Sequence, residues 1–415
     1  MKNIFATGIL LCFISTLSSV RAEESQSFSL NDIFQTAKKL DVSIRKSESR
    51  QTEQDEQRHL AQSNYYPSLI AQSTGFSNQL VLTQKVWDGG FASASVRLAN
   101  SEKKIAEYNE HSNLRSLFHS VSEAYYYALF TTQKVMLLEN SAKLVSDSIA
   151  TAEKQMKYGA IGKNSLLRAK VAQRRTLSEL FEANNQKTFY SRTLGRLTRT
   201  EHFNLNTLSE RLNPSEIPIP PNYTSTDMIK IVGTHAPEIM TLNERQKVEV
   251  ERKNITLAED RLHISFVMSY GLGQNNPPKS IYPGYQTGFN LGAFISLPIF
   301  SGLSTQAKDA ISHERVFQLR QDLNATEESI VFDTQQLLNS LTQDREDIKQ
   351  TDLEINYAES IWKEVNTEYQ AGLGNAELWF EALNNLNTWK IEQLSKTRDY
   401  LIHYAQLKDN LNEIE

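Results

Sequence analysis

Residues 91–158 read FASASVRLANSEKKIAEYNEHSNLRSLFHSVSEAYYYALFTTQKVMLLENSAKLVSDSIATAEKQMKY and contain neither Gly nor Pro. At about 1.5 Å per residue, this stretch can form one helix about 100 Å long. Apolar residues recur at every seventh position, and a second such line starts three residues later. The two lines are Leu114, Val121, Ala128, Val135, Ala142, Ile149 and Met156, and Leu117, Ala124, Thr131, Leu138, Val145 and Ala152. This heptad pattern predicts a helix that coils left-handedly against partner helices.

The pattern occurs a second time, 213 residues further along the chain. Trp87-Asp88-Gly89 before the long helix corresponds to Phe300-Ser301-Gly302, and Gly159 after it corresponds to Gly372. The stretch 303–371 again lacks Gly and Pro. The sequence therefore predicts two tandem copies of one unit.

Each copy is expected to contain a helix, a β-hairpin, a long helix and a last helix. In the first copy, 23–212, these are 30–62, hairpin 68–87 with its turn near Ser77-Asn78, helix 91–158 and helix 164–194. In the second copy, 224–415, a first helix precedes hairpin 264–300, helix 303–371 and helix 375–413. The linker 213–223 holds four prolines, which exclude a helix there.

The return strand of the second hairpin alternates strictly between two kinds of residue. One face consists of Phe289, Leu291, Ala293, Ile295, Leu297 and Ile299, and the other is mostly small or polar. Transmembrane strands alternate in this way, although an ordinary half-buried sheet shows the same pattern. Past residue 22 no apolar stretch reaches the length of a membrane-spanning helix. If the protein is integral to a membrane, we therefore expect strands to cross it.

The N-terminal residues 1–22 are expected to be a signal peptide. Lys2 precedes an apolar run, and Val20-Arg21-Ala22 supplies the small residues of a cleavage site. Cys12, the only cysteine, lies in that run and would be removed with it. We therefore expect a mature chain without thiols, which excludes disulfides and cysteine metal sites.

Nothing in the sequence points to an enzyme. The net charge of −5 gives no excess of positive charge for binding nucleic acid. The histidines are scattered, and neither a glycine-rich phosphate loop nor a nucleophile elbow is present. We expect no catalytic residues, no cofactor and no metal.

Four strands cannot close a barrel, and open sheet edges are not tolerated in lipid. The chain is therefore expected to form oligomers. Two copies would supply eight strands with a plugged interior, whereas three would supply twelve strands with room for a lumen. The helices would continue this ring as a hollow cylinder. Such an assembly is a conduit.

Several short motifs, in duplicated order behind a signal peptide, resemble those of the TolC-like outer membrane efflux and secretion proteins. They are Tyr66-Pro67-Ser68-Leu69, Val86-Trp87-Asp88-Gly89-Gly90, Leu297-Pro298-Ile299-Phe300-Ser301-Gly302, and the turns 158–162 and 369–374. The resemblance implies a mainly α-helical homotrimer with a shared twelve-stranded transmembrane β-barrel. It places the protein in the outer membrane of a Gram-negative bacterium, in contact with outer membrane lipid, with a periplasmic α-helical tunnel.

The same resemblance implies a tip that opens when a periplasmic adaptor and an inner-membrane transporter dock. Tyr369 matches a tyrosine of the closed aperture, and Glu381 matches one of its acidic residues. Leu378, Gly374 and Ser165 stand where the family has an acid, an arginine and an aspartate, and Glu377 is a candidate substitute for the acid. The expected docking residues are Gly159, Ala160, Gly162, Arg168, Gly372, Leu373 and Gly374.

We interpret the chain as the exit duct of a tripartite export system. Type I protein secretion is the preferred function, because the expected mature chain has no cysteine for a lipid anchor. Efflux of drugs or toxic compounds is the alternative. A periplasmic coiled-coil adaptor or a fibrous coiled coil would also contain long helices. An adaptor would carry compact β domains, and the alternation at 289–299 argues against a fibre.

Overall fold

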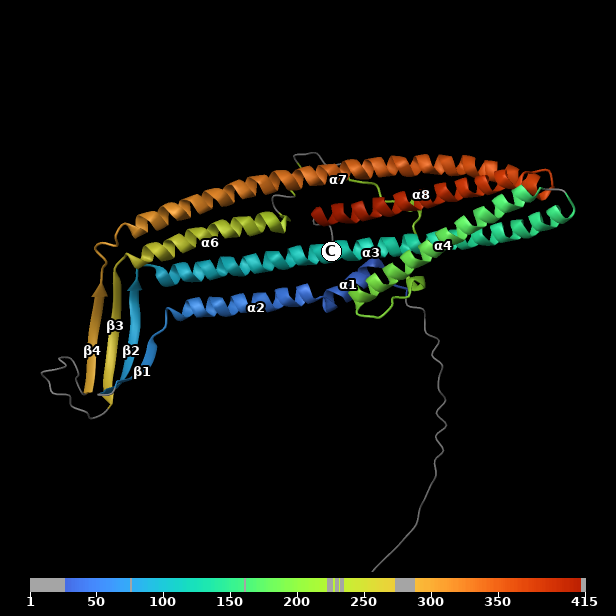
Figure 1. Ribbon diagram of the computed structural model, residues 1–415. Coiled ribbons are helices and arrows are strands. Elements are labelled where there is room, and N and C mark those ends of the chain that lie inside the picture. Colours follow the sequence, from blue (N-terminus) through green and yellow to red (C-terminus); the bar gives the residue numbers. More distant parts are fainter. Residues whose placement is uncertain are drawn as a thin grey trace, which may run out of the picture.

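The computed structural model describes residues 27–74, 77–159, 162–221, 227, 231, 235–272 and 288–411. Long helices lie side by side, with a small sheet at one end of the molecule (Figure 1). The helices are α1 (Leu30–Leu40), α2 (Val42–Ser63), α3 (Phe91–Lys157), α4 (Lys163–Thr198), α6 (Pro237–Glu259), α7 (Ser304–Gln370) and α8 (Ala376–Asn410). The strands are β1 (Ser68–Thr74), β2 (Ser77–Asp88), β3 (His263–Leu272) and β4 (Gly288–Ser296). The expected signal peptide, 1–22, lies outside the described residues.

The two predicted long helices are confirmed, because α3 and α7 each contain 67 residues. The second heptad line of α3 is buried along its whole length, from Leu117 to Ala152. In α7 the residues that correspond to the first heptad line are buried only towards the C-terminal half of the helix, as at Leu341, Ile348 and Ile355. No residue of α7 before Thr334 is buried. This half of α7 packs against α6 and leaves its other side open.

The expected single helix 30–62 is wrong, because the chain breaks at Asp41. This residue has an extended backbone, with φ −68° and ψ 136°, and separates α1 from α2. Its carboxylate accepts hydrogen bonds from the backbone N–H groups of Ser43, at 2.7 Å, and Ile44, at 3.3 Å. Aspartate is a preferred N-cap since it satisfies donors that a new helix leaves free. A local side-chain bond therefore ends one helix and starts the next without Gly or Pro.

The last helix of the first copy is longer than expected. It was predicted to end at 194, whereas α4 continues to Thr198 and ends at Arg199, whose φ of 58° is left-handed. Leu194 and Thr198 are both buried. The added turn thus packs against the rest of the protein instead of fraying into the linker.

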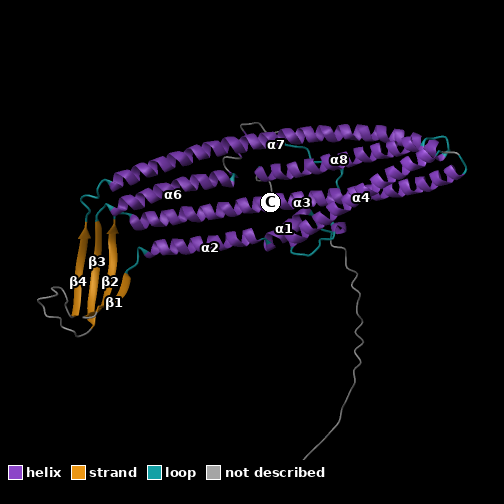
Figure 2. Cartoon of the chain, in the orientation of Figure 1, coloured by secondary structure: helices purple, strands orange, loops and turns teal. Residues whose placement is uncertain are grey.

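All four strands form one antiparallel sheet in the order β1-β2-β3-β4, and the strands stand together in Figure 2. The first hairpin turns earlier than expected, because Ser77 pairs with Thr74 and belongs to β2. The return strand β4 ends at Ser296, and not near Ile299, since Pro298 has no N–H for a ladder. Pairing of β2 with β3 joins the two copies, and β1 and β4 are the outer strands of the sheet.

Two sets of helices lie along α3 and α7. Next to the sheet the order of contacts is α2, α3, α6, α7, and towards the opposite end it is α4, α3, α8, α7. The end of α8 and the start of α6 therefore meet near the middle of the molecule (Figure 1). Among the described residues, none of the helices combines the length and the apolar composition needed to cross a membrane.

Residues 200–221, which include the described part of the linker, run over the helices as an irregular strap with two short 3-10 turns, Leu205–Thr207 and Pro214–Glu216. Leu205 and Leu212 of the strap pack into the largest core cluster. The hydroxyl of Tyr400 on α8 donates a hydrogen bond to the carbonyl of Pro218. The proline-rich segment is thus held against the helices.

Candidate functional site

The predicted site residues gather at the end of the molecule opposite the sheet, where two turns join α3 to α4 and α7 to α8. We call this end the tip (Figure 1). Gly159 and Gly372 follow the helix ends with φ of 73° and 79°. A Cβ added at either would meet nothing within 4 Å, so the left-handed backbone alone requires glycine there. Ala160 lies outside the described residues.

Gly374 is required for a different reason, which the sequence did not reveal. Its φ is not in the left-handed region, but a Cβ would lie 2.6 Å from the backbone nitrogen of Tyr369. The N–H groups of Leu373 and Gly374 both donate to the carbonyl of Glu368 at 3.0 Å. The turn is folded so tightly onto the end of α7 that no arginine, the residue expected here from the family, fits in this conformation.

Tyr369 lies inside the protomer, with 5% of its surface exposed. Its hydroxyl donates to the carbonyl of Ser148 on α3, at 3.2 Å, and accepts from the Ser148 hydroxyl, at 3.0 Å. Ser165, which stands where the family has an aspartate, is therefore not its partner. The bond ties the end of α7 to α3, and so ties the second copy to the first.

An aromatic cluster surrounds this hydrogen bond. The ring of Trp379 lies 5.0 Å from Trp362, 5.5 Å from Tyr369 and 5.0 Å from Phe380, measured between centroids. The indole N–H of Trp379 donates to the side chain of Asn366 at 2.8 Å. Because such contacts depend on shape, they hold α7 and α8 at a defined distance close to the tip.

Arg168 and Glu377 form an ion pair between α4 and α8. The two side chains are 65% and 51% exposed, so water weakens their attraction, and such pairs contribute about 0–1 kcal/mol. The structure thus brings together a predicted docking residue and a predicted aperture residue. A second tie, between Lys170 and Glu153 at 2.8 Å, holds α4 to α3 and lowers the pKa of Glu153.

Glu381 lies one turn after Glu377 on the exposed side of α8. Among the described residues it takes part in no ion pair, in contrast to Glu377. Gly162 and Leu373 are also exposed, Leu373 at 86%. An apolar side chain this open at the end of a molecule is available for contact with another protein.

Between α4 and α8 the surface forms a hollow of about 530 Å³, here called the tip groove. Its floor contains Leu138, Val145 and Leu383, and Leu167 and Val171 of α4 form its apolar side, with Val171 69% exposed. Arg168 and Arg175 line the α4 side, and Glu377 and Glu381 line the α8 side. No groove was expected here from the sequence, although Leu167 and Val171 lie one turn apart on a face of α4 that α3 does not cover.

Ligand chemistry is not evident at the tip. Within the described ranges, no three His, Cys, Asp or Glu side chains are close enough to hold a metal ion together. The arrangement offers an apolar groove bordered by charged side chains. Arg168 pairs with Glu377 between the two helices, and Arg175 pairs with Glu179 along α4. Such a surface suits an amphipathic helix of another protein.

Comparison with known proteins gives a family match over part of the chain and a fold over nearly all of it. Residues 241–413 match the family model described as outer membrane efflux protein. No curated protein matches the chain.

Solved structures match nearly the whole chain. The CmeC outer membrane channel of Campylobacter jejuni matches with a TM-score of 0.76 and 15% identity, over 99% of this chain and 94% of that one. The open state of the MtrE outer membrane channel of Neisseria gonorrhoeae matches with 0.76 and 15%, over 93% and 90%. CusC matches with 0.76 and 16%, over 92% and 91%. At such identities these matches establish the fold. Together with the family model over 241–413, they confirm the resemblance and the fold class expected from the sequence.

Proposed function

We propose, from the premise that residues 241–413 belong to the outer membrane efflux protein family, that three copies of this chain form the exit duct of a tripartite export system. The observation that carries the proposal is the sheet. Its outer strands, β1 and β4, are each paired on one side only, and such edges pair with further copies. Three copies would close a ring of twelve strands above a helical tunnel.

Oligomer formation and conduction test this proposal together. Outer-membrane fractions run without boiling should show a band near three times the monomer mass, which collapses on heating. The purified protein should form conducting pores in planar bilayers. A soluble monomer without a heat-sensitive band would contradict the proposal and favour the adaptor or fibrous interpretation.

The partners in this proposal are a periplasmic adaptor and an inner-membrane transporter, which dock at the tip. The tip groove supports this part, because its apolar side and its charged edges suit an amphipathic helix. Val171→Glu should prevent the adaptor from co-purifying with the channel while the oligomer remains. Val42→Glu, at an exposed valine far from the tip, is the matched control. Equal recovery of the adaptor with both variants would place docking elsewhere.

For the cargo we propose protein secretion of type I, supported by the absence of a cysteine after residue 22. Efflux of small molecules is the second candidate, which the description of the matched family favours. Deletion of the gene separates them. Loss of a protein from the culture medium with unchanged drug sensitivity indicates secretion, and the reverse result indicates efflux.

In the trimer, Glu381 is proposed to form a ring of three carboxylates that attracts cations to the aperture, since like charges in a narrow pore create a strong local field. Glu381→Gln should weaken block by divalent cations. The matched control is Glu314→Gln, which removes the same charge from an exposed position of α7 far from the tip. Block that is unchanged in Glu381→Gln would show that Glu381 is a solvated helix carboxylate.

A further inference from the structure

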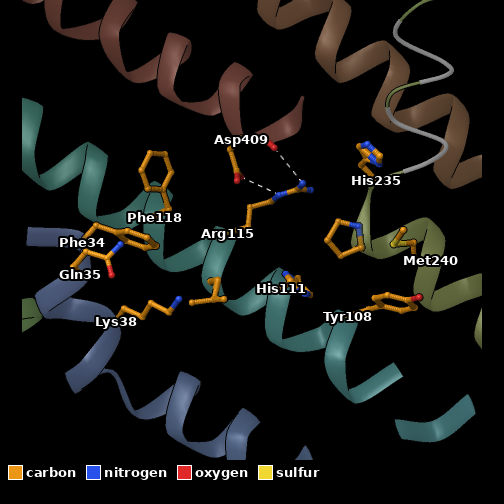
Figure 3. Close-up of a pocket in the computed structure, with 12 residues that line it drawn as sticks. Phe34, Gln35, Lys38, Tyr108, His111, Arg115, Phe118, His235, Met240 and Asp409 are labelled. Carbon is orange, nitrogen blue, oxygen red and sulfur yellow. Dashed lines mark hydrogen bonds and ion pairs between the residues drawn. The ribbon is translucent and has the colours of Figure 1, made fainter. Parts of the chain in front are cut away.

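We propose that the cavity between α1, α3, α6 and the end of α8 binds a small amphipathic carboxylate. It lies near the middle of the molecule, where α8 ends beside the start of α6 (Figure 3). Its volume is about 410 Å³, within the range of about 300–1,000 Å³ typical of pockets for small ligands. This inference does not rest on the proposed export function.

The cationic side chains at this cavity come from α1 and α3. Lys38 and Arg115 line it, together with the imidazoles of His111 and His235, and Asp409 is the acidic residue among its described lining. In Figure 3 Lys38 extends from α1, whereas His111 and Arg115 extend from α3. An anion entering the cavity would therefore meet the ammonium group of Lys38 near hydrogen-bond donors of α3.

Asp409 does not neutralise Lys38, because its carboxylate faces Arg115 and His119 instead. The distances to its Oδ2 are 2.9 Å from Arg115 Nε and 2.8 Å from His119 Nε2. Arg115 also approaches Glu238 of α6, at 3.4 Å. Among the described residues, Lys38 and His111 have neither an ion pair nor a side-chain hydrogen bond. Their donors remain available to a carboxylate.

The covered position of Arg115 indicates that the packing of the helices forms the cavity. Arg115 follows Leu114 and lies beside the heptad line of α3, where a charged residue is ordinarily exposed. Its side chain is only 16% exposed, because α6 and the end of α8 cover it. The fixed Arg115 and Asp409 therefore form a rigid wall, and no rearrangement is needed to create the space.

Apolar side chains complete the cavity and set the kind of anion. Phe34 and Phe118 meet edge to face, with ring centroids 5.2 Å apart. Leu114, Pro237 and Met240 continue this surface. A small inorganic anion would leave it uncovered, whereas a carboxylate on an aromatic or aliphatic body would cover it and place its charge near Lys38.

Calorimetric titration of the full-length channel in amphipol with 2-naphthoate tests this site, with the neutral 2-naphthalenemethanol as a second probe. We expect the acid to bind about 10-fold more tightly than the alcohol. Lys38→Gln should weaken binding of the acid about 5- to 10-fold and leave the alcohol unchanged. Lys39→Gln is the matched control, because Lys39 is the next residue of α1, is exposed and does not line the cavity.

Three results would overturn the proposal. They are no binding of 2-naphthoate at millimolar concentration, equal affinities for the acid and the alcohol, and equal effects of the Lys38 and Lys39 substitutions. The last would indicate attraction to the protein surface in general. Circular dichroism of each variant checks that the helices are intact. Met240→Asp, which adds a negative charge to the wall, should abolish binding of the acid independently of Lys38.

Discussion

At Gly374 a single missing side chain allows the second tip turn to close onto α7. A Cβ there would lie 2.6 Å from the nitrogen and 2.8 Å from the Cα of Tyr369. Because backbone atoms cannot yield cheaply, Gly374→Ala should open the turn at a cost of about 1–3 kcal/mol. Hydrogen exchange should then be faster at Leu373 and at position 374, whose N–H groups bond to Glu368.

Gly162→Ala is the control for this change. Gly162 belongs to the other tip turn, has φ −79°, and would place a Cβ in open space. Its variant should therefore exchange like the wild type. If Gly374→Ala also exchanges like the wild type, the turn is looser than the structure indicates.

Tyr369 is proposed to hold the tip closed through its hydroxyl group. Tyr369→Phe keeps the ring among Trp362, Trp379 and Phe380 but loses both hydrogen bonds to Ser148. We expect a loss of about 1 kcal/mol and more frequent openings in single-channel recordings. Tyr357→Phe, at a tyrosine of α7 that is 67% exposed, should leave the recordings unchanged. Unchanged openings in both variants would assign Tyr369 to packing alone.

At the scale of elements, Asp41 makes the joint between α1 and α2 sensitive to acid. Burial raises the pKa of Asp41, but hydrogen bonds from Ser43 and Ile44 and the charge of Arg199 outweigh it, and the pKa is lowered. Since the folded-state pKa lies below the unfolded value of about 3.9, the carboxylate stabilises the joint fully above about pH 4. This stabilisation is lost as the pH falls through the folded-state pKa.

Asp41→Ala should therefore cost about 1 kcal/mol at neutral pH and show little difference from the wild type in strong acid. Asp41→Asn should keep the cap at neutral pH and remove the acid dependence. Hydrogen exchange at Ser43 and Ile44 measures both effects. A wild-type joint with no acid dependence relative to Asp41→Asn would show that the carboxylate does not act as the cap.

Periodicity predicted the elements well where a single long pattern decides them. The heptads of α3 and the alternation of β4 gave correct types and nearly correct bounds. The heptads mark the buried face of α3, and the alternation separates the two faces of β4, of which the apolar one is exposed in the protomer. Asp41 was missed, since a cap inside a stretch without Gly or Pro is decided by hydrogen bonds that its carboxylate accepts from residues two and three positions later, Ser43 and Ile44.

The site was less predictable from the sequence. Tyr369 was identified, but its partner Ser148 lies 221 residues away, and no pattern in one sequence connects them. The tip groove also depends on how far α4 and α8 stand apart. Ala169 of α4 and Phe380 of α8 belong to one buried cluster, so this distance depends on packing between helices and not on either helix alone.

At the scale of the whole molecule, the two copies depend on each other. β2 pairs with β3 from Asn78 to Asp88, and α3 packs against α6 and α8 of the second copy. If the chain is divided after Pro221, we expect the halves to assemble when expressed together, because this interface is extensive. Co-purification through a tag on one half, and recovery of the heat-sensitive oligomer, measure the result.

Either half alone should fail to give that oligomer, and the undivided chain is the control. An oligomer of normal size from the second half alone would contradict this expectation. Such a result would mean that the two copies are interchangeable. The bond of Tyr369 in the second copy to Ser148 in the first copy argues against this.

The unequal continuity of the helices has a mechanical consequence. α3 and α7 are continuous helices. The helices beside them are interrupted, between α1 and α2 at Asp41 and between the end of α8 and the start of α6. A rod of this length that bends by about 5° at its midpoint moves its far end by about 4 Å, at about 1.5 Å per residue. The joints let the shorter helices follow such a bend without stretching. We therefore expect that a small bend near the middle of these helices displaces the tip relative to the sheet.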